Sequence, residues 1–179
     1  MEKYIEEILY SEADIKREVK RIGKEITKDY KGKTPILVGL LKGSVPFMAE
    51  LIKYIKTDVQ IDFMKVSSYC GAHSSGSVRI VSDTTTSLKD RDVVIVEDIV
   101  DTGLTLSEVI KLIKAKGAAS IAICTLCDKP EARLYPAADP KYIGFNIPDK
   151  FIVGFGLDYN ELYRNLPYIG VLKKEVYSD

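Results

Sequence analysis

The stretch VVIVEDIVDTGLT, residues 93–105, passes from an apolar run through a short polar loop to the start of a helical pattern. Its first four residues are β-branched and apolar, as in a strand that is covered on both faces of a sheet. Glu97, Asp98 and Asp101 come next, and Gly103 precedes the helix. We therefore predict a third strand at residues 92–97, with three carboxyl groups at or just beyond its carboxyl end.

Similar units lie on both sides of this stretch. The apolar run ILVGLL, residues 36–41, precedes a helix-length apolar segment at residues 45–55. Residues 11–30 carry Ile15, Val19, Ile22 and Ile26 at helical spacing. Further strands are predicted at residues 59–66, 78–81, 120–126, 142–145 and 151–154. Because strands and helices alternate, we predict an α/β fold in which helices flank a mostly parallel, twisted sheet.

Length and charge limit the classes of protein that fit. The chain of 179 residues has the length of one domain, with no linker or repeat. Its 26 basic and 26 acidic side chains cancel, so we expect no nucleic-acid partner. No apolar stretch is long enough to span a bilayer, and the charged start is unlike a signal peptide. We expect a cytoplasmic protein without a membrane partner.

The few cysteines and the one histidine exclude some chemistry. Cys70, Cys124 and Cys127 are an odd and sparse set, which argues against a disulfide framework. Cys124 and Cys127 form a CxxC motif within an apolar run, so we interpret them as buried rather than reactive. His73 is the only histidine, which excludes a cluster of histidines around zinc.

The loop after residue 97 is suited to a phosphate group. The amino end of a helix offers free main-chain N–H groups, and Gly103 lets an anion approach the backbone. An alternative is that Asp101 or Thr105 simply caps the helix. Capping does not explain Glu97 and Asp98, because two adjacent carboxylates repel each other unless a cation is bound beside them. The cluster therefore indicates a phosphate and cation site.

An apolar strand followed by EDIVDTGLT resembles the phosphoribosyl pyrophosphate signature of the type I phosphoribosyltransferases. The resemblance implies that Glu97 and Asp98 face the ribose hydroxyls and Mg²⁺, and that Asp101 is the general base beside the purine ring. It also assigns the 5'-phosphate to the loop residues Asp101, Thr102, Gly103, Leu104 and Thr105.

The later segment PDKFIVGFGLDYNELYRNLPYIG, residues 148–170, resembles the hood of hypoxanthine-guanine phosphoribosyltransferases. This resemblance implies that Phe151 stacks on the purine and that the backbone of Ile152 meets the base edge. Asp158 would serve the base and a second Mg²⁺, and Arg164 would reach the pyrophosphate. Lys129 follows the fourth strand, and its donors suit a 6-oxo group better than the 6-amino group of adenine.

The same resemblance extends to two further loops. LLKGS, residues 40–44, resembles the family's pyrophosphate loop, with Lys42 and Gly43 as ligands and a cis peptide at Leu41–Lys42. Residues 67–80, including Ser68 and Tyr69, resemble its flexible lid, although an ordinary exposed hairpin is the alternative. A single domain is then expected, with a core at about 11–128 and a hood contributed mainly by 129–179.

The resemblance implies purine salvage: hypoxanthine or guanine and phosphoribosyl pyrophosphate would give IMP or GMP and pyrophosphate, in a homodimer or homotetramer that needs Mg²⁺. Two alternatives stay open. One is a regulatory module that binds phosphoribosyl pyrophosphate, which would be expected to carry a basic surface or a DNA-binding segment. The other is an enzyme of the same fold that acts on orotate or adenine.

Overall fold

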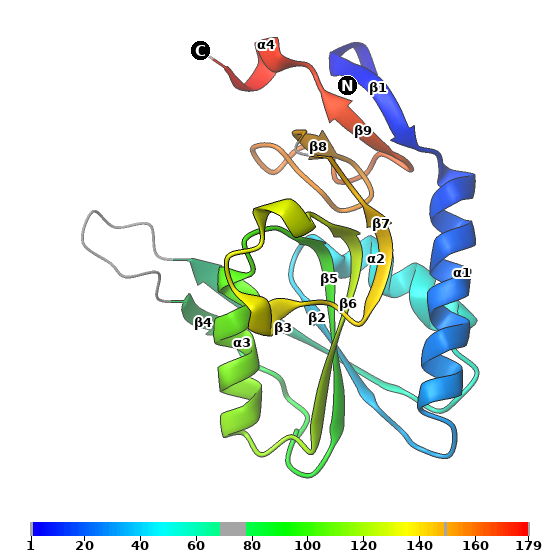
Figure 1. Cartoon of the computed structure of the whole chain (residues 1–179), viewed down its shortest axis with the longest axis vertical. Helices are drawn as coiled ribbons and strands as arrows, with labels where there is room; N and C mark the ends of the chain where they lie inside the picture. Colours follow the sequence, from blue (N-terminus) through cyan, green and yellow to red (C-terminus); the bar gives the residue numbers. More distant parts are fainter. Residues whose placement is uncertain (1, 69–77, 149, 179) are drawn as a thin grey trace.

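The structure is a computed structural model that describes residues 2–68, 78–148 and 150–178. Within these residues the chain forms a large sheet with the strand order β4-β3-β2-β5-β6-β7 and a small sheet with the order β1-β9-β8 (Figure 1). The large sheet consists of β2 (Ile36–Leu40), β3 (Gln60–Ser68), β4 (Val78–Ser82), β5 (Asp92–Val100), β6 (Ser120–Asp128) and β7 (Tyr142–Asn146).

The large sheet is mostly parallel, which confirms the predicted fold class. Its parallel pairs are β2 with β3 and β5, β5 with β6, and β6 with β7, while β4 runs antiparallel to β3. Every residue of β2 is buried, because helices cover both faces of the sheet.

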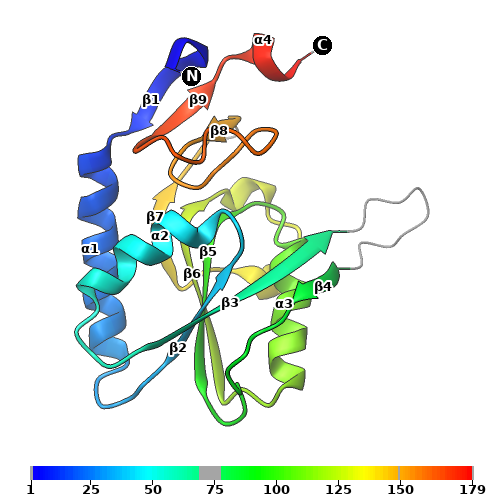
Figure 2. The same ribbon diagram turned by 180° about the vertical axis from the view of Figure 1, so that it is seen from behind.

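The helices α1 (Glu12–Asp29) and α2 (Ser44–Leu51) lie on one face of the large sheet, and α3 (Leu104–Ala115) lies on the other (Figure 2). Successive side chains of a strand point to opposite faces of the sheet, so each face presents apolar side chains to the helices that cover it. Val94 and Val96 of β5 pack with α1 and α2, whereas Val93 and Ile95 pack with α3. Ser11 caps α1 in a capping box with Asp14.

The small sheet joins the two ends of the chain. It is antiparallel and consists of β1 (Ile5–Tyr10), β8 (Ile152–Val153) and β9 (Ile169–Leu172). It lies beyond the end of the large sheet at which β5 and β6 finish (Figure 1). The sequence predicted neither β1 nor β9, since each is short and the two strands that pair lie more than a hundred residues apart in the sequence.

Two strands lie outside the approximate residue ranges expected for the core and for the main part of the hood. β7 belongs to the large sheet although it follows residue 128, and β1 belongs to the small sheet although it precedes residue 11. The remaining elements are 3-10 helices at Glu2–Tyr4, Ile52–Tyr54, Pro130–Ala132 and Pro136–Ala138, and α4 (Lys174–Tyr177). Among the described residues, no helix combines the length and the apolar character needed to cross a membrane.

Candidate active site

Glu97 and Asp98 belong to strand β5 itself and not to the loop that follows it. The predicted end of the strand at Glu97 is wrong, because β5 continues to Val100. It does so because β6 also continues to Asp128, so that Glu97 pairs with Thr125 and Ile99 with Cys127. Adjacent side chains of a strand point to opposite sides, which separates the directions of the Glu97 and Asp98 side chains.

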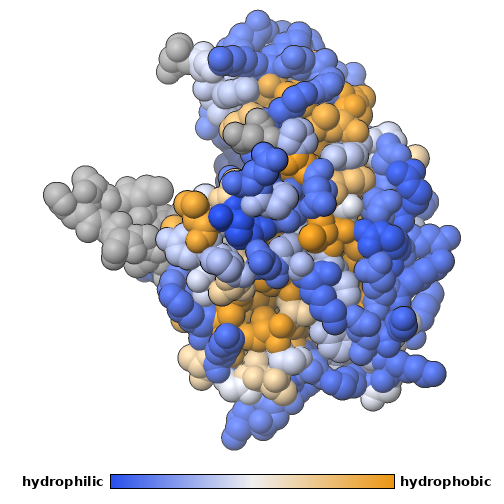
Figure 3. All heavy atoms as spheres, viewed as in Figure 1, coloured by the Kyte–Doolittle hydropathy of each residue, from blue (hydrophilic) through white to orange (hydrophobic). Residues whose placement is uncertain are grey.

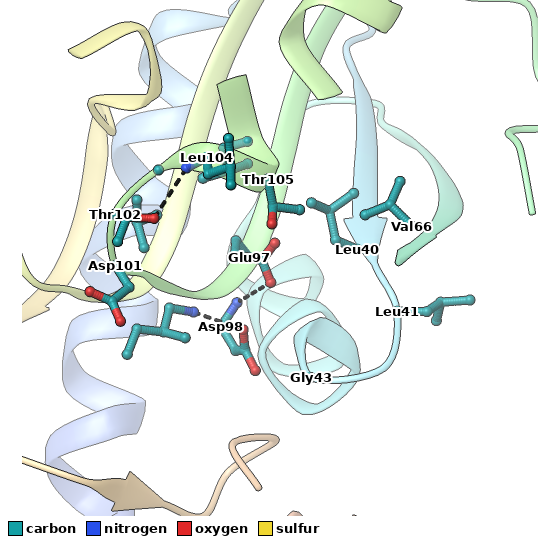
Figure 4. Close-up of a pocket in the computed structure, with 14 residues that line it drawn as sticks. Leu40, Leu41, Gly43, Val66, Glu97, Asp98, Asp101, Thr102, Leu104 and Thr105 are labelled. Carbon is teal, nitrogen blue, oxygen red and sulfur yellow. Dashed lines mark hydrogen bonds between the residues drawn. The ribbon is translucent and has the colours of Figure 1, made fainter. Parts of the chain in front are cut away.

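The surroundings of this pair disfavour two negative charges. Burial, reinforced by the charge of Asp98, raises the pKa of Glu97 well above its ordinary value. Burial also raises the pKa of Asp98, although the hydrogen bonds that it accepts oppose the shift. Asp98 N–H donates to Glu97 Oε1 at 3.2 Å, and Ile99 N–H donates to Asp98 Oδ1 at 2.8 Å (Figure 4). A divalent cation at this place would stabilise the ionised pair.

The loop between β5 and α3 leaves the first amides of the helix without a side-chain cap. Gly103 precedes α3 with φ of 85°, in the left-handed region that glycine adopts without a steric penalty. Thr102 Oγ1 accepts only a long hydrogen bond of 3.4 Å from Leu104 N–H. In the described part of the chain, neither Asp101 nor Thr105 caps the helix, so the capping alternative is wrong.

A cavity of about 300 Å³ lies between this loop and the segment after β2 (Figure 4). Gly43 faces Asp98 so closely that a methyl group at position 43 would overlap the carboxylate. The peptide bond Leu41–Lys42 is cis, as the resemblance implied. The predicted residues that line this cavity are Gly43, Glu97, Asp98, Asp101, Thr102, Gly103, Leu104 and Thr105.

A second cavity, of about 670 Å³, adjoins the first on the side of the small sheet. Figure 3 shows the molecule hollowed between the two sheets. The two cavities share the lining residues Asp98, Ile99, Asp101 and Thr105. The other walls of the second cavity are Lys129, Lys150, Phe151, Ile152, Leu157 and Asp158.

Phe151 is 37% exposed although it is a large aromatic residue. Its ring stacks on Tyr177, with the ring centres 4.7 Å apart, and meets the edge of Tyr159. Because it lines the second cavity while neighbouring rings hold it, Phe151 offers a fixed apolar wall for a flat ligand.

In the described residues, neither Lys42 nor Arg164 lines either cavity. Both instead bond Glu161, with Lys42 Nζ 2.6 Å from Oε2 and an Arg164 nitrogen 3.3 Å from Oε1. Arg164 also contacts Asp158 at 2.9 Å. Glu161, which makes both contacts, was not among the residues expected from the sequence to form the site.

The described residues contain no group of three or more histidine, cysteine or acidic side chains that could hold a metal ion alone. Mg²⁺ in proteins usually takes one or two carboxylates and completes its ligands with water and substrate oxygens. Glu97 and Asp98, which are adjacent and partly or fully buried, fit that pattern.

The backbone of Ser68 ends β3, whereas Tyr69, Cys70 and His73 lie outside the described residues. Cys124 and Cys127 are free and buried, as predicted, and burial raises the pKa of both thiols. This makes them unreactive at neutral pH.

Comparisons with known proteins agree with the geometry. Residues 6–160 match the phosphoribosyl transferase domain family. Hypoxanthine-guanine phosphoribosyltransferases of Streptococcus pyogenes serotype M3 and Streptococcus agalactiae serotype V are 56% and 55% identical over 179 residues, with 99% of each chain covered. A crystal structure of a hypoxanthine phosphoribosyltransferase from Staphylococcus aureus is 50% identical with a TM-score of 0.96, covering 100% of this chain and 97% of that one. The chain therefore belongs to the phosphoribosyltransferase family, in the group of the hypoxanthine-guanine phosphoribosyltransferases.

Proposed function

We propose that the protein transfers the phosphoribosyl group of phosphoribosyl pyrophosphate to hypoxanthine or guanine and so forms IMP or GMP in purine salvage. The observation that carries this proposal is the pair of adjoining cavities that share Asp98, Ile99, Asp101 and Thr105. One cavity suits a phosphate and the other a flat base, so their junction suits the carbon atom at which the two substrates react. The names of the similar proteins support the same reaction.

In this reaction the purine N9 forms a bond to C1' of the ribose, and the bond from C1' to the pyrophosphate oxygen breaks. As this bond forms, the purine loses the proton on N7, and Asp101 would accept that proton, because Asp101 lines both cavities. Thr102, Gly103, Leu104 and Thr105 would bind the 5'-phosphate through main-chain N–H and hydroxyl groups. Most of the rate enhancement would come from positioning and electrostatics.

Glu97 and Asp98 would hold the ribose hydroxyls and Mg²⁺, and Asp158 would help to hold a second Mg²⁺. When bound, Mg²⁺ supplies positive charge that stabilises the pyrophosphate as it leaves. The raised pKa values of Glu97 and Asp98 support a cation at this place, since burying two adjacent carboxylates without one is unfavourable.

The second cavity would select the base. Lys129 would donate to the 6-oxo group, Phe151 would stack on the ring, and the backbone of Ile152 would meet its edge. Lys42, Gly43 and Arg164 would bind pyrophosphate, which requires that Lys42 and Arg164 exchange Glu161 for a phosphate. Ser68 and Tyr69 would belong to a lid that excludes water, and this role stays a prediction.

The chain would act as a single domain, in the cytoplasm, and as a homodimer or homotetramer. The phosphoribosyltransferase assignment supports substrates of low molecular weight as its partners. A regulatory module is less favoured than an enzyme, because the similar proteins are named as phosphoribosyltransferases and Asp101, the candidate general base, lines both cavities.

The test is pyrophosphate release from phosphoribosyl pyrophosphate, with and without Mg²⁺, in the presence of hypoxanthine, guanine, xanthine, adenine or orotate. We expect Mg²⁺-dependent release with the 6-oxopurines and none with adenine or orotate. Release with adenine or orotate would contradict the role of Lys129. Binding of phosphoribosyl pyrophosphate without turnover of any base would favour the regulatory alternative.

A further inference from the structure

Arg133 lies directly behind the phosphate loop and was not among the residues expected from the sequence to form the site. It follows the short 3-10 helix Pro130–Ala132, and its side chain is only 8% exposed. Its guanidinium group bonds the carboxylate of Asp128, the carboxylate of Asp139 at 3.2 Å and the main-chain oxygen of Asp101 at 2.5 Å. One buried cation thus joins the end of β6 to the loop that carries the candidate general base.

The same side of the loop is held by main-chain contacts. Leu134 N–H and Tyr135 N–H both donate to the main-chain oxygen of Thr102, at 3.0 and 3.1 Å. The loop also has no free space behind it, because a methyl group on Gly103 would lie 2.8 Å from Ala138 Cβ and 3.3 Å from Arg133 Cδ. The position of the loop therefore depends on the segment that contains Arg133.

The chemistry of arginine suits this position. A guanidinium group is planar and presents five donors in fixed directions, so it can bond two carboxylates and a carbonyl at once. Asp128 is almost buried, and burial raises its pKa while Arg133 opposes that shift. Lysine could compensate the charge of Asp128, but its single ammonium group lacks the planar fork.

We propose that Arg133 is a positioning residue that fixes the backbone at Asp101 and so sets where the general base and the 5'-phosphate amides lie. Among the described residues that line the two cavities, Arg133 is absent, so it acts through Asp101 and not on a substrate. The inference rests on the proposed function and adds to it a residue behind the site that controls its geometry.

The experiment compares Arg133→Met and Arg133→Lys with Arg21→Met as the matched control. Arg21 has similar bonds, to Glu18, to Glu25 and to the main-chain oxygen of Ile143, but it lies on α1 away from both cavities. Steady-state kinetics for each substrate are measured on the intact protein, and the folded fraction is measured by circular dichroism.

For Arg133→Met we expect kcat to fall about 100-fold, because displacements of the order of 1 Å can have that effect. We also expect the KM for phosphoribosyl pyrophosphate to rise roughly tenfold, while the KM for hypoxanthine changes little, since only the phosphate loop moves. Arg133→Lys should recover most of the thermal stability but less of the activity. Arg21→Met should leave kcat and both KM values unchanged.

A purely structural role of Arg133 would lower the folded fraction without moving either KM, and that result would overturn the inference. A rise in the KM for hypoxanthine alone would also overturn it. If Arg133→Met does not fold, Arg133→Lys decides, and wild-type kinetics in that variant would reject the positioning role. An inactive wild-type protein would instead contradict the proposed function itself.

Discussion

The two cavities of the site are built from different kinds of segment. The first cavity, to which we assign the phosphate and which we call the phosphate cavity, is lined almost entirely by Leu40, Leu41, Gly43 and residues 97–106. The second cavity, to which we assign the base and which we call the base cavity, is lined by residues from separate parts of the chain. These are the end of β5, Lys129 and residues between 150 and 158. Its outer wall adjoins the small sheet, in which β9, near the end of the chain, pairs with β1, near the start, and with β8. Most of the phosphate cavity therefore comes from one continuous segment, whereas the base cavity combines several separate segments.

The largest expected effect lies where the two cavities meet. Asp101→Asn keeps the shape of the side chain but removes the carboxylate that accepts the proton from N7. We expect kcat to fall by about 10²–10⁴ with little change in either KM, as for the loss of a general base. Steady-state kinetics with hypoxanthine give the result, and unchanged turnover would remove the general-base role from Asp101.

A smaller and more selective effect is expected at the base end. Lys129→Met keeps the length of the side chain but removes the donor for the 6-oxo group. A hydrogen bond from a charged donor contributes about 1.5–3 kcal/mol, so kcat/KM for hypoxanthine should fall roughly 10- to 100-fold. The KM for phosphoribosyl pyrophosphate should stay the same, which kinetics with each substrate varied in turn would check.

Gly43→Ala provides the matching variant at the phosphate end. A methyl group there would overlap the carboxylate of Asp98, so Asp98 must move. We expect a raised KM for phosphoribosyl pyrophosphate, and a KM for hypoxanthine that is changed less. If Gly43→Ala and Lys129→Met each change the kinetic constants for both substrates equally, the two cavities do not act as separate parts of the site.

The smallest effect on activity is expected at Asp62 in β3, which lines neither cavity in the described residues. Burial raises the pKa of Asp62, but the N–H groups of Thr86 and Phe63, both at 2.7 Å, outweigh burial and hold the pKa below its ordinary value of 3.8. Because the pKa is lower in the folded state, the carboxylate contributes stability above pH 3.8. That contribution is lost as the pH falls through the folded-state pKa.

Asp62→Asn should therefore lower the free energy of unfolding at pH 7 by about 1 kcal/mol and should flatten its decrease in acid. Urea unfolding at pH 7 and at pH 3 measures both effects. The activity per folded molecule should equal that of the wild type. A variant that loses stability in acid as steeply as the wild type would show that Asp62 does not carry this pH dependence.

The sequence alone determined the parts whose physics is local. Alternating and continuous apolar runs predicted the parallel sheet, and the order of residues in EDIVDTGLT predicted which side chains would gather at the phosphate cavity. The end of β5 predicted from the sequence was too early. The additional hydrogen bonds come from β6, whose length could not be predicted from the sequence.

Only the tertiary structure decided the features that join distant residues. It paired β1 with β9, brought Glu161 to Lys42, and placed Arg133 against the main-chain oxygen of Asp101. Each partner has an ordinary local sequence, since a charged or mixed surface segment carries no periodic signal for a specific contact elsewhere in the chain. These contacts follow from how the folded sheets bring the segments together, so the groups that hold the site in place could be named only once the chain was folded.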